Sequence, residues 1–538
     1  MGWQTETVGK IVDHALIGRY DIPEFQRGFV WKPDQLRSLL SSLYRDYPIG
    51  AMLVWEPIHE YNYPRSAQGL RNPDWIVDGQ QRITALCLAF GKKPYWWADA
   101  ESWNRETEKF DILLDLESMR STPQFHLPTK AKRADARYLS IRDALQCAED
   151  RNALTRLADE ICNSSATDPG LVWSTLTNII ALSTRPIPIV SVQHSIEDVA
   201  EIFSKVNQAG TRVKEADVTL ALLAAYNASW IRKEFLPFSR GLSELGFDLD
   251  SGILIKTISG IEHGTARVGE VPQEWWKQEI TQPWTRAKRA ISGVLKYLAS
   301  RGLLSGRLIP SHNSLIPLFA LAGKHPSTIN LDRAFRWFLL ANAEGRYSGA
   351  PNEILTKDLR TIHLASDAVA ALTSLEEDLP SFEEISPERF LESYRGNTFG
   401  KLLLSLILFD GEASDWLDGN RIGYSIDDNM LLEGFLPDWH HIYPENVLKK
   451  VRLQKAKMDA LANITILNKP SNRHKIRSTP PEIYSIQFNI GSSQLKSHFV
   501  PSDIELTIEN YDRFIAERAE LLADAANCYF KRLMALDG

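Results

Sequence analysis

Residues 438–477 constrain the fold and the chemistry of this chain more than any other segment. They read DWHHIYPENVL, then a basic, helix-like stretch, then NITILNKPSNRHKIR. Residues 442–443 are strand-like, Pro444 ends that strand, and residues 463–467 alternate as a second strand does. Residues 472–476 then predict the start of a helix. We therefore expect the order strand, loop, strand, helix.

Histidines are concentrated in this segment, which holds three of the twelve in the chain. Two of them, His440 and His441, are adjacent, and adjacent residues of a strand point to opposite faces. One imidazole can therefore bind a metal while the other faces water. A histidine with a pKa near ~6.5 suits a general base at neutral pH. A divalent metal polarises a phosphoryl oxygen and stabilises the leaving oxyanion.

The charge of the segment agrees with a phosphate substrate. Residues 438–477 hold nine Lys/Arg and three Asp/Glu, a balance of +6 inside a chain of net charge −7. Binding to a nucleic-acid backbone needs such a local patch, whatever the total charge. The alternative is a histidine pair that occurs by chance in a basic surface region.

The segment resembles the HNH, or ββα-metal, nuclease domain at the C-terminus of GmrSD-type restriction proteins. The resemblance rests on H-H-I-x-P at residues 440–444, N-I-T-I-L at residues 463–467 and N-R-x-K at residues 472–475. It implies that His441 is the general base and that His440 and Asn472 bind the metal. It further implies that Asn463 braces the hairpin.

Four more polar residues of the segment belong to the expected site. Lys475 would lie near the phosphate and assist catalysis. Asp438 is a further acid that competes for a place among the metal ligands. His474 could be a ligand or a DNA contact, and Arg473 is expected among the DNA-contacting residues. The expected metal is Mg²⁺ or Mn²⁺.

A second motif, IVDGQQR at residues 76–82, predicts a strand, a tight turn at Gly79 and a helix. The start of a helix offers free backbone N–H groups and the positive end of the helix dipole, which suit a phosphate. Gln80, Gln81 and Arg82 would add side-chain donors, and Asp78 could hold a metal or orient a water. The alternative is a turn capped by the aspartate.

Two other strings, IPEFQRGFVW at residues 22–31 and EIFSKVNQAGT at residues 201–211, complete a resemblance to the N-terminal domain of GmrSD proteins. That domain is similar to ParB and sulfiredoxin, and the resemblance covers about residues 8–225. It implies binding and hydrolysis of a nucleoside triphosphate (GTP, ATP, CTP or UTP), with Asp78 needed for hydrolysis. The implied nucleotide contacts are Gln26, Arg27, Asp78, Gly79, Gln80, Gln81, Arg82 and Asn207. For Arg27 and Arg82, a structural salt bridge or cap is the alternative.

The length of 538 residues exceeds what one core supports, about 250–300 residues, so several domains are expected. We predict a multidomain α+β chain: a ParB-like α/β domain at residues 1–225, a helical middle with a linker at residues 226–385, and the nuclease domain with additional helices at residues 386–538. Residues 281–307 of the middle hold six Lys/Arg and no acid. They could follow a DNA backbone or form a solvated helix face.

The sequence contains neither a signal-peptide pattern nor an apolar run near the ~20 residues that span a bilayer, so we expect a cytoplasmic protein without membrane contact. The resemblance implies an NTP-regulated, metal-dependent DNA endonuclease or nickase in antiphage defence, acting on modified or foreign double-stranded DNA. A homo-oligomer and companion defence proteins are open as further partners. The alternatives are an NTP-dependent DNA-binding regulator with an inactive nuclease domain, and a DNA-nicking toxin controlled by a partner.

Overall fold

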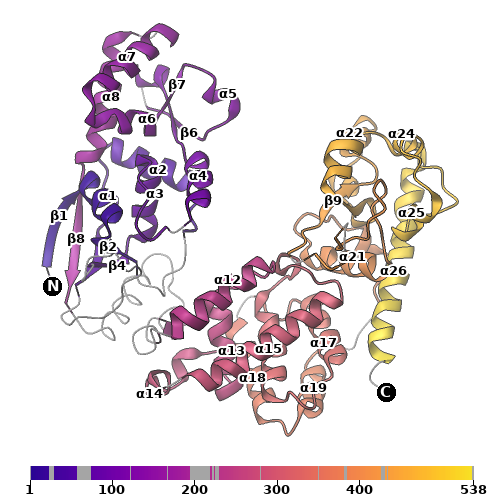
Figure 1. The fold of residues 1–538 in the computed structure, drawn as a ribbon. Helices are drawn as coiled ribbons and strands as arrows, with labels where there is room; N and C mark the ends of the chain where they lie inside the picture. Colours follow the sequence, from indigo (N-terminus) through magenta and orange to yellow (C-terminus); the bar gives the residue numbers. More distant parts are fainter. Residues whose placement is uncertain are drawn as a thin grey trace. The chain divides into compact units, whose positions relative to one another are not determined.

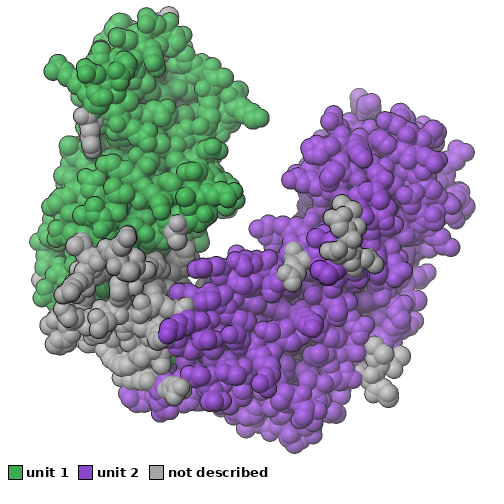
Figure 2. Space-filling model, in the orientation of Figure 1, with its two compact units in different colours: residues 1–228 green, residues 229–538 purple. Residues whose placement is uncertain are grey.

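The computed structural model divides into two compact units, residues 1–228 and 229–538 (Figures 1 and 2). No helix among the described residues is long and apolar enough to cross a membrane. The structure describes residues 2–22, 29–56, 74–97, 99–120, 123–165, 168–193, 219–220, 223, 230–278, 280–348, 351–380, 384–425, 430–432 and 434–535.

The first unit is built on a mixed five-stranded sheet with the strand order β1-β8-β3-β4-β2. Strands β3 and β8 pair in parallel, as do β2 and β4, whereas β3 pairs with β4 and β1 with β8 in antiparallel fashion. The strands are β1 (Gly2–Thr7), β2 (Tyr20–Asp21), β3 (Met52–Trp55), β4 (Asp74–Asp78) and β8 (Pro186–Val192).

Both faces of this sheet are apolar. Met52 and Val54 face the main core, whereas Leu53 and Trp55 belong to a second buried cluster on the other face. This explains why β3 and β4 read as continuous apolar runs in the sequence and not as alternating ones.

Helices and a small second sheet complete the unit. The sheet has the order β6-β5-β7, with β5 (Leu113–Asp115), β6 (Phe125–His126) and β7 (Tyr138–Ser140). The helices are α1 (Val8–Ile17), α2 (Pro33–Tyr44), α3 (Gln80–Phe90), α4 (Ala100–Lys109), α5 (Lys130–Arg133), α6 (Ile141–Gln146), α7 (Arg151–Ser165) and α8 (Pro169–Ile180).

The second unit begins with a helical region, as the sequence predicts. Its helices are α12 (Leu236–Glu244), α13 (Ser251–His263), α14 (Gln273–Lys277), α15 (Thr281–Ser300), α16 (Leu315–Lys324), α17 (Leu331–Ala343), α18 (Pro351–Leu364) and α19 (Ala368–Glu377). The long helix α26 (Tyr511–Ala535) packs against α17 and also against α20 (Glu388–Leu391) and α21 (Thr398–Asp410). The expected α+β class is confirmed, and the ParB-like and HNH folds stay predictions.

The C-terminal part of this unit carries one two-stranded sheet among short helices. Strand β9 (Asp438–His441) pairs in antiparallel fashion with β10 (Ile464–Leu467). The remaining elements are α22 (Glu445–Lys450), α23 (Lys455–Met458), the π-helix η9 (Pro470–Ile476), α24 (Pro481–Gln487) and α25 (Ser492–Ser497).

Arg518 on α26 is fully buried and holds this part together. Its Nη1 donates to the carbonyls of Ala462 and Ile464 at 2.6 and 2.9 Å, and its Nε and Nη2 donate to that of His498 at 3.2 and 3.0 Å. Burial lowers the pKa of its guanidinium to about 9. In the described part of the chain no carboxylate pairs with it, so backbone carbonyls alone satisfy this charge.

We predict that Arg518→Met lowers the free energy of unfolding by about 3 kcal/mol or more, because it leaves three buried carbonyls without a donor. Urea unfolding of the full chain measures this. Arg513→Met is the matched control, since Arg513 lies on the same helix but is exposed and pairs with Asp503 and Glu517. The control should lose much less stability, because exposed ion pairs contribute little. Equal losses in the two variants would contradict the role given to Arg518.

Candidate active site

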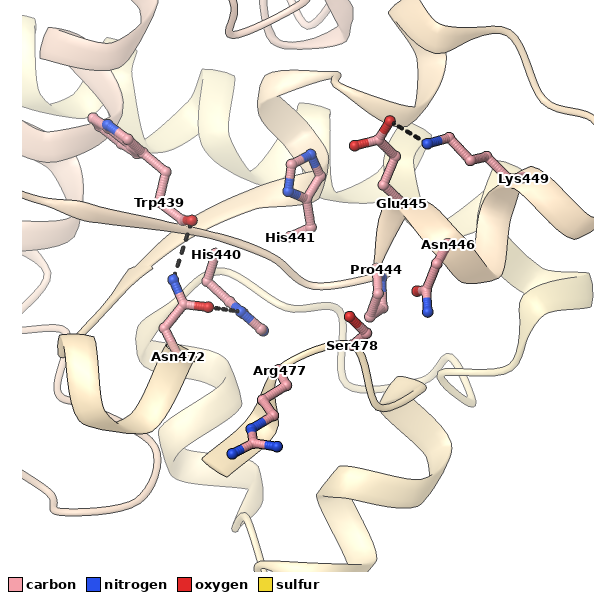
Figure 3. A pocket seen from close by; sticks show the side chains of 10 residues that line it. All are labelled: Trp439, His440, His441, Pro444, Glu445, Asn446, Lys449, Asn472, Arg477 and Ser478. Carbon is pink, nitrogen blue, oxygen red and sulfur yellow. Dashed lines mark hydrogen bonds and ion pairs between the residues drawn. The ribbon is translucent and has the colours of Figure 1, made fainter. Parts of the chain in front are cut away.

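The β9–β10 hairpin places the two adjacent histidines on opposite sides of one strand (Figure 3). His440 pairs with Thr465 in the register, and His441 pairs with Ile464. The expectation that residues 442–443 form the strand is wrong, because the strand ends at His441. Ile442 and Tyr443 are fully buried instead, since their apolar side chains pack into the core.

Asn463 joins the two arms of the hairpin where the strands end. Its Oδ1 accepts from the Tyr443 backbone N–H at 2.9 Å. Its Nδ2 donates to the carbonyls of Tyr443 and Met458 at 3.0 and 2.9 Å. A buried side chain with three backbone hydrogen bonds has the geometry that the predicted brace needs.

His440 and Asn472 lie together on the same side of β9 (Figure 3). His440 Nδ1 is 2.8 Å from Asn472 Oδ1. The Asn472 amide group donates to the carbonyl of Trp439 at 3.2 Å, which turns Oδ1 toward the histidine. Burial lowers the pKa of His440 to about 4, so its ring is neutral at pH 7. Its Nε2 has no hydrogen-bond partner among the described residues.

The contact between His440 and Asn472 is a hydrogen bond in this structure, and its geometry also suits a hard divalent cation that would take the place of the shared proton. Two neighbouring ligands of an octahedral Mg²⁺ with bonds of about 2.1 Å lie about 3 Å apart, and the observed nitrogen–oxygen separation is 2.8 Å. A neutral imidazole and an amide oxygen are both suitable ligands. The described residues contain no group of three or more His, Cys, Asp and Glu suited to a metal, so water and substrate would complete the coordination.

His441 leaves the strand on the other side and contacts an acid that the sequence reasoning missed. Its Nε2 is 3.0 Å from Oδ1 of the buried Asp459. The ring of Tyr394 packs edge-on against His441 with centroids 5.5 Å apart.

A cavity of about 310 Å³ joins both histidines and Asn472 (Figure 3). Three of its lining residues, His440, His441 and Asn472, were predicted as site residues, whereas the cations Lys449 and Arg477 were not. The lining residues are Trp439, His440, His441, Pro444, Glu445, Asn446, Lys449, Asn472, Arg477 and Ser478.

Asp438, Arg473, His474 and Lys475 do not line this cavity. Asp438 forms a two-pronged salt bridge with Arg473, at 2.8 Å from Oδ1 to Nη2 and 2.8 Å from Oδ2 to Nε. His474 and Lys475 are exposed. The metal-ligand roles predicted for Asp438 and His474 and the catalytic role predicted for Lys475 therefore have no support from the cavity geometry. The DNA contacts predicted for Arg473 and His474 stay predictions.

Arg477 lines the cavity together with Lys449, and its residue pattern did not predict a place in the site. Its backbone has φ 53° and ψ −119°, a region that residues with a side chain rarely adopt. Its backbone N–H donates to the carbonyl of Asn472 at 2.9 Å, and its Nε donates to that of His474 at 3.0 Å. The strained turn is thus held by η9, which also carries Asn472, and it brings a guanidinium to the cavity.

The second predicted site has the local structure that its sequence predicts. Strand β4 ends at Asp78, Gly79 has φ 104°, and α3 begins at Gln80. Arg82 donates to the carbonyls of Ile49 and Ala51 at 2.7 and 2.8 Å, and to Asp78 Oδ2 at 3.0 Å. Arg82 therefore has the structural role that was its alternative, and its contact with a nucleotide stays a prediction.

The two glutamines of the motif stand in the first turn of α3. Gln81 Oε1 accepts from the backbone N–H of Val30 at 2.9 Å, which ties the helix start to the segment before α2. The other predicted nucleotide contacts, Gln26, Arg27 and Asn207, lie outside the described residues.

The basic stretch of the middle region is partly neutralised. Arg286 pairs with Glu262 at 2.7 Å and Lys288 with Glu234 at 2.9 Å, and Arg301 pairs with Asp332. This favours the solvated helix face over a path for DNA.

Comparison with known proteins identifies the first unit. Residues 8–224 match the family model of the GmrSD restriction endonuclease N-terminal domain. The chain is also similar to the uncharacterized protein MJ0686 of Methanocaldococcus jannaschii, at 20% identity over 97% of this chain and 98% of that protein. The name of that relative states no activity. Residues 8–224 of this chain are therefore a GmrSD restriction endonuclease N-terminal domain by their match to that family model.

Proposed function

We propose that this chain is a metal-dependent DNA endonuclease whose active site is the cavity at the β9–β10 hairpin. One observation carries the proposal: His440, His441 and Asn472 meet at one cavity, although Asn472 lies 32 residues after His440 in the chain. The match of residues 8–224 to a restriction endonuclease N-terminal domain supports DNA as the substrate.

The residues on the two sides of β9 would have different roles in the reaction. His441 takes a proton from water, whose oxygen then attacks the scissile phosphorus. His440 and Asn472 hold Mg²⁺ or Mn²⁺, which when bound stabilises charge on the phosphate and on the leaving oxygen. Arg477 and Lys449 lie where they can bind the phosphate that enters the cavity.

The surroundings supply further positive charge for a nucleic-acid backbone. Among the described residues, five Lys/Arg side chains of residues 438–477 make no ion pair with an acid, so they remain available to phosphates. They are Lys450, Arg452, Lys469, Lys475 and Arg477.

The first unit would bind a nucleoside triphosphate at the β4–α3 turn and govern cutting from there. The helix start at Gln80, with Asp78 before it, supports this part of the proposal. Restriction of modified or foreign DNA in antiphage defence is the biological role we propose.

Removal of the proposed general base, His441, should strongly reduce DNA cleavage. We expect His441→Ala to reduce Mg²⁺- or Mn²⁺-dependent nicking of a supercoiled plasmid about 10²–10⁴-fold, because no other group would accept the proton of water. His474→Ala, which removes an exposed histidine outside the cavity, should retain most activity. Equal activity of wild type and His441→Ala would refute the proposal and leave a DNA-binding regulator. A panel of plain and modified plasmids, with and without each nucleotide, defines the substrate.

Substitutions of Arg477 and Lys475 should affect different quantities, the catalytic rate and the affinity for DNA. Arg477→Met should lower kcat about 10–100-fold, because it removes a cation beside the reacting phosphate. Lys475→Met should weaken DNA binding and lower the salt dependence of binding by about one counterion, with kcat unchanged. Single-turnover rates and salt titrations of affinity measure the two effects. The reverse assignment would restore Lys475 as the catalytic cation.

Asp78→Ala should abolish hydrolysis of the nucleotide that the first unit uses, tested with GTP, ATP, CTP and UTP. Asp74→Ala is the control, because Asp74 starts the same strand and, among the described residues, its side chain pairs with Arg19 at a long 3.7 Å. Phosphate release measures both. Unchanged hydrolysis in Asp78→Ala would show that the nucleotide site lies elsewhere.

A further inference from the structure

We propose that Asp459 is a positioning residue for His441, and that Arg395 holds Asp459 in place. The inference rests on the proposed nuclease function. It adds to that function the group that selects which nitrogen of His441 receives the proton.

The contact between the two side chains is buried and direct. Asp459 is 1% exposed, and its Oδ1 is 3.0 Å from His441 Nε2. The ring of Tyr394 lies edge-on to the imidazole and restricts its rotation. The histidine still reaches the cavity, which it helps to line.

Asp459 is itself fixed from a distant part of the chain. Arg395 Nε donates to Asp459 Oδ2 at 2.6 Å. The backbone N–H of Tyr394 donates to the Asp459 carbonyl at 2.8 Å, and an isolated bridge pairs Ser393 with Ala460. Each oxygen of the Asp459 carboxylate thus has a hydrogen-bond partner. Residues 393–395, before α21, hold Asp459 against His441.

This arrangement determines the tautomer of the base. An ionised carboxylate only accepts hydrogen bonds, so the nitrogen that faces it, Nε2, must carry a proton. Nδ1 of the neutral ring then holds the lone pair that accepts the proton of water. When water loses that proton, the O–H bond breaks, the new N–H bond forms at Nδ1, and Asp459 stays ionised and stabilises the imidazolium.

A purely structural salt bridge is the competing explanation, and Asp459→Asn separates the two. Arg395 only donates, so the amide oxygen of the substituted side chain would face Arg395 and its NH₂ group would face His441. Nε2 must then accept, which moves the proton to Nδ1 and leaves the base without its lone pair toward water. A structural role would lower stability without this change of tautomer.

The experiment compares full-length wild type with Asp459→Asn in metal-dependent DNA cleavage. We expect kcat to fall about 100-fold, within the range for groups that orient a catalytic residue, with KM changed less than about two-fold. Asp358→Asn is the matched control, since Asp358 is also fully buried and paired with an arginine, Arg346, at 2.6 Å. It should lower the melting temperature and leave kcat unchanged.

A second measurement reads the tautomer directly. Long-range ¹H–¹⁵N spectra of ¹⁵N-histidine protein, with His441 assigned by its loss in His441→Ala, should show Nε2–H in wild type and Nδ1–H in Asp459→Asn. Wild-type kcat in Asp459→Asn, or an Nδ1–H tautomer in wild type, would overturn the inference. If wild type does not cut DNA, the proposed function fails, and the spectra still decide the tautomer.

Discussion

The C-terminal site depends on the hydrogen bonds that the buried guanidinium of Arg518 donates to backbone carbonyls. It donates to the carbonyls on either side of Asn463, at Ala462 and Ile464. Ile464 is the residue that pairs with His441 in the hairpin. Arg518 on α26 therefore fixes the backbone around Asn463, which joins the two strands of the hairpin. It also fixes Ile464 of β10, which pairs with His441. Because the charge is fully hydrogen-bonded, its burial is tolerated.

A buried acid, Asp415, fixes the backbone at the other end of β10. Asp415 is fully buried, and its Oδ2 accepts from the Asn468 backbone N–H at 2.8 Å while its Oδ1 accepts from Ser471 Oγ at 2.7 Å. These bonds fix the turn between β10 and η9, the helix that carries Asn472. The first unit uses a related device, since Arg82 at the start of α3 bonds to carbonyls just before β3. In both units, a strand–turn–helix junction is held by side chains that bond to a neighbouring backbone.

Sequence reasoning succeeded where the pattern is local. The strand–glycine–helix junction at Gly79 follows from residues adjacent in the chain, and so does the placement of His440 and His441 on opposite sides of a strand. It failed where the cause is distant. Strand β9 ends at His441, before the strand-like Ile442, because the Asn463 side chain bonds to the backbone N–H and carbonyl of Tyr443 in place of a partner strand. Tyr443 itself packs against aromatic rings of α26.

The partners of the site residues could not be predicted for the same reason. Arg395 reaches Asp459 from 64 residues away, and no spacing rule connects them. Arg477 comes to the cavity through a backbone conformation that its residue type does not favour. Asp438 was predicted as an acid that competes for a place among the metal ligands, but Arg473 on η9 bonds to both of its oxygens.

The central claim is that the two adjacent histidines have different tasks, with His440 on the metal and His441 on water. Pulsed electron paramagnetic resonance of bound Mn²⁺ in ¹⁵N-histidine protein tests it most directly. The account predicts coupling to one coordinated histidine nitrogen, which disappears in His440→Ala and persists in His441→Ala. Coupling that persists in His440→Ala and disappears in His441→Ala would contradict it.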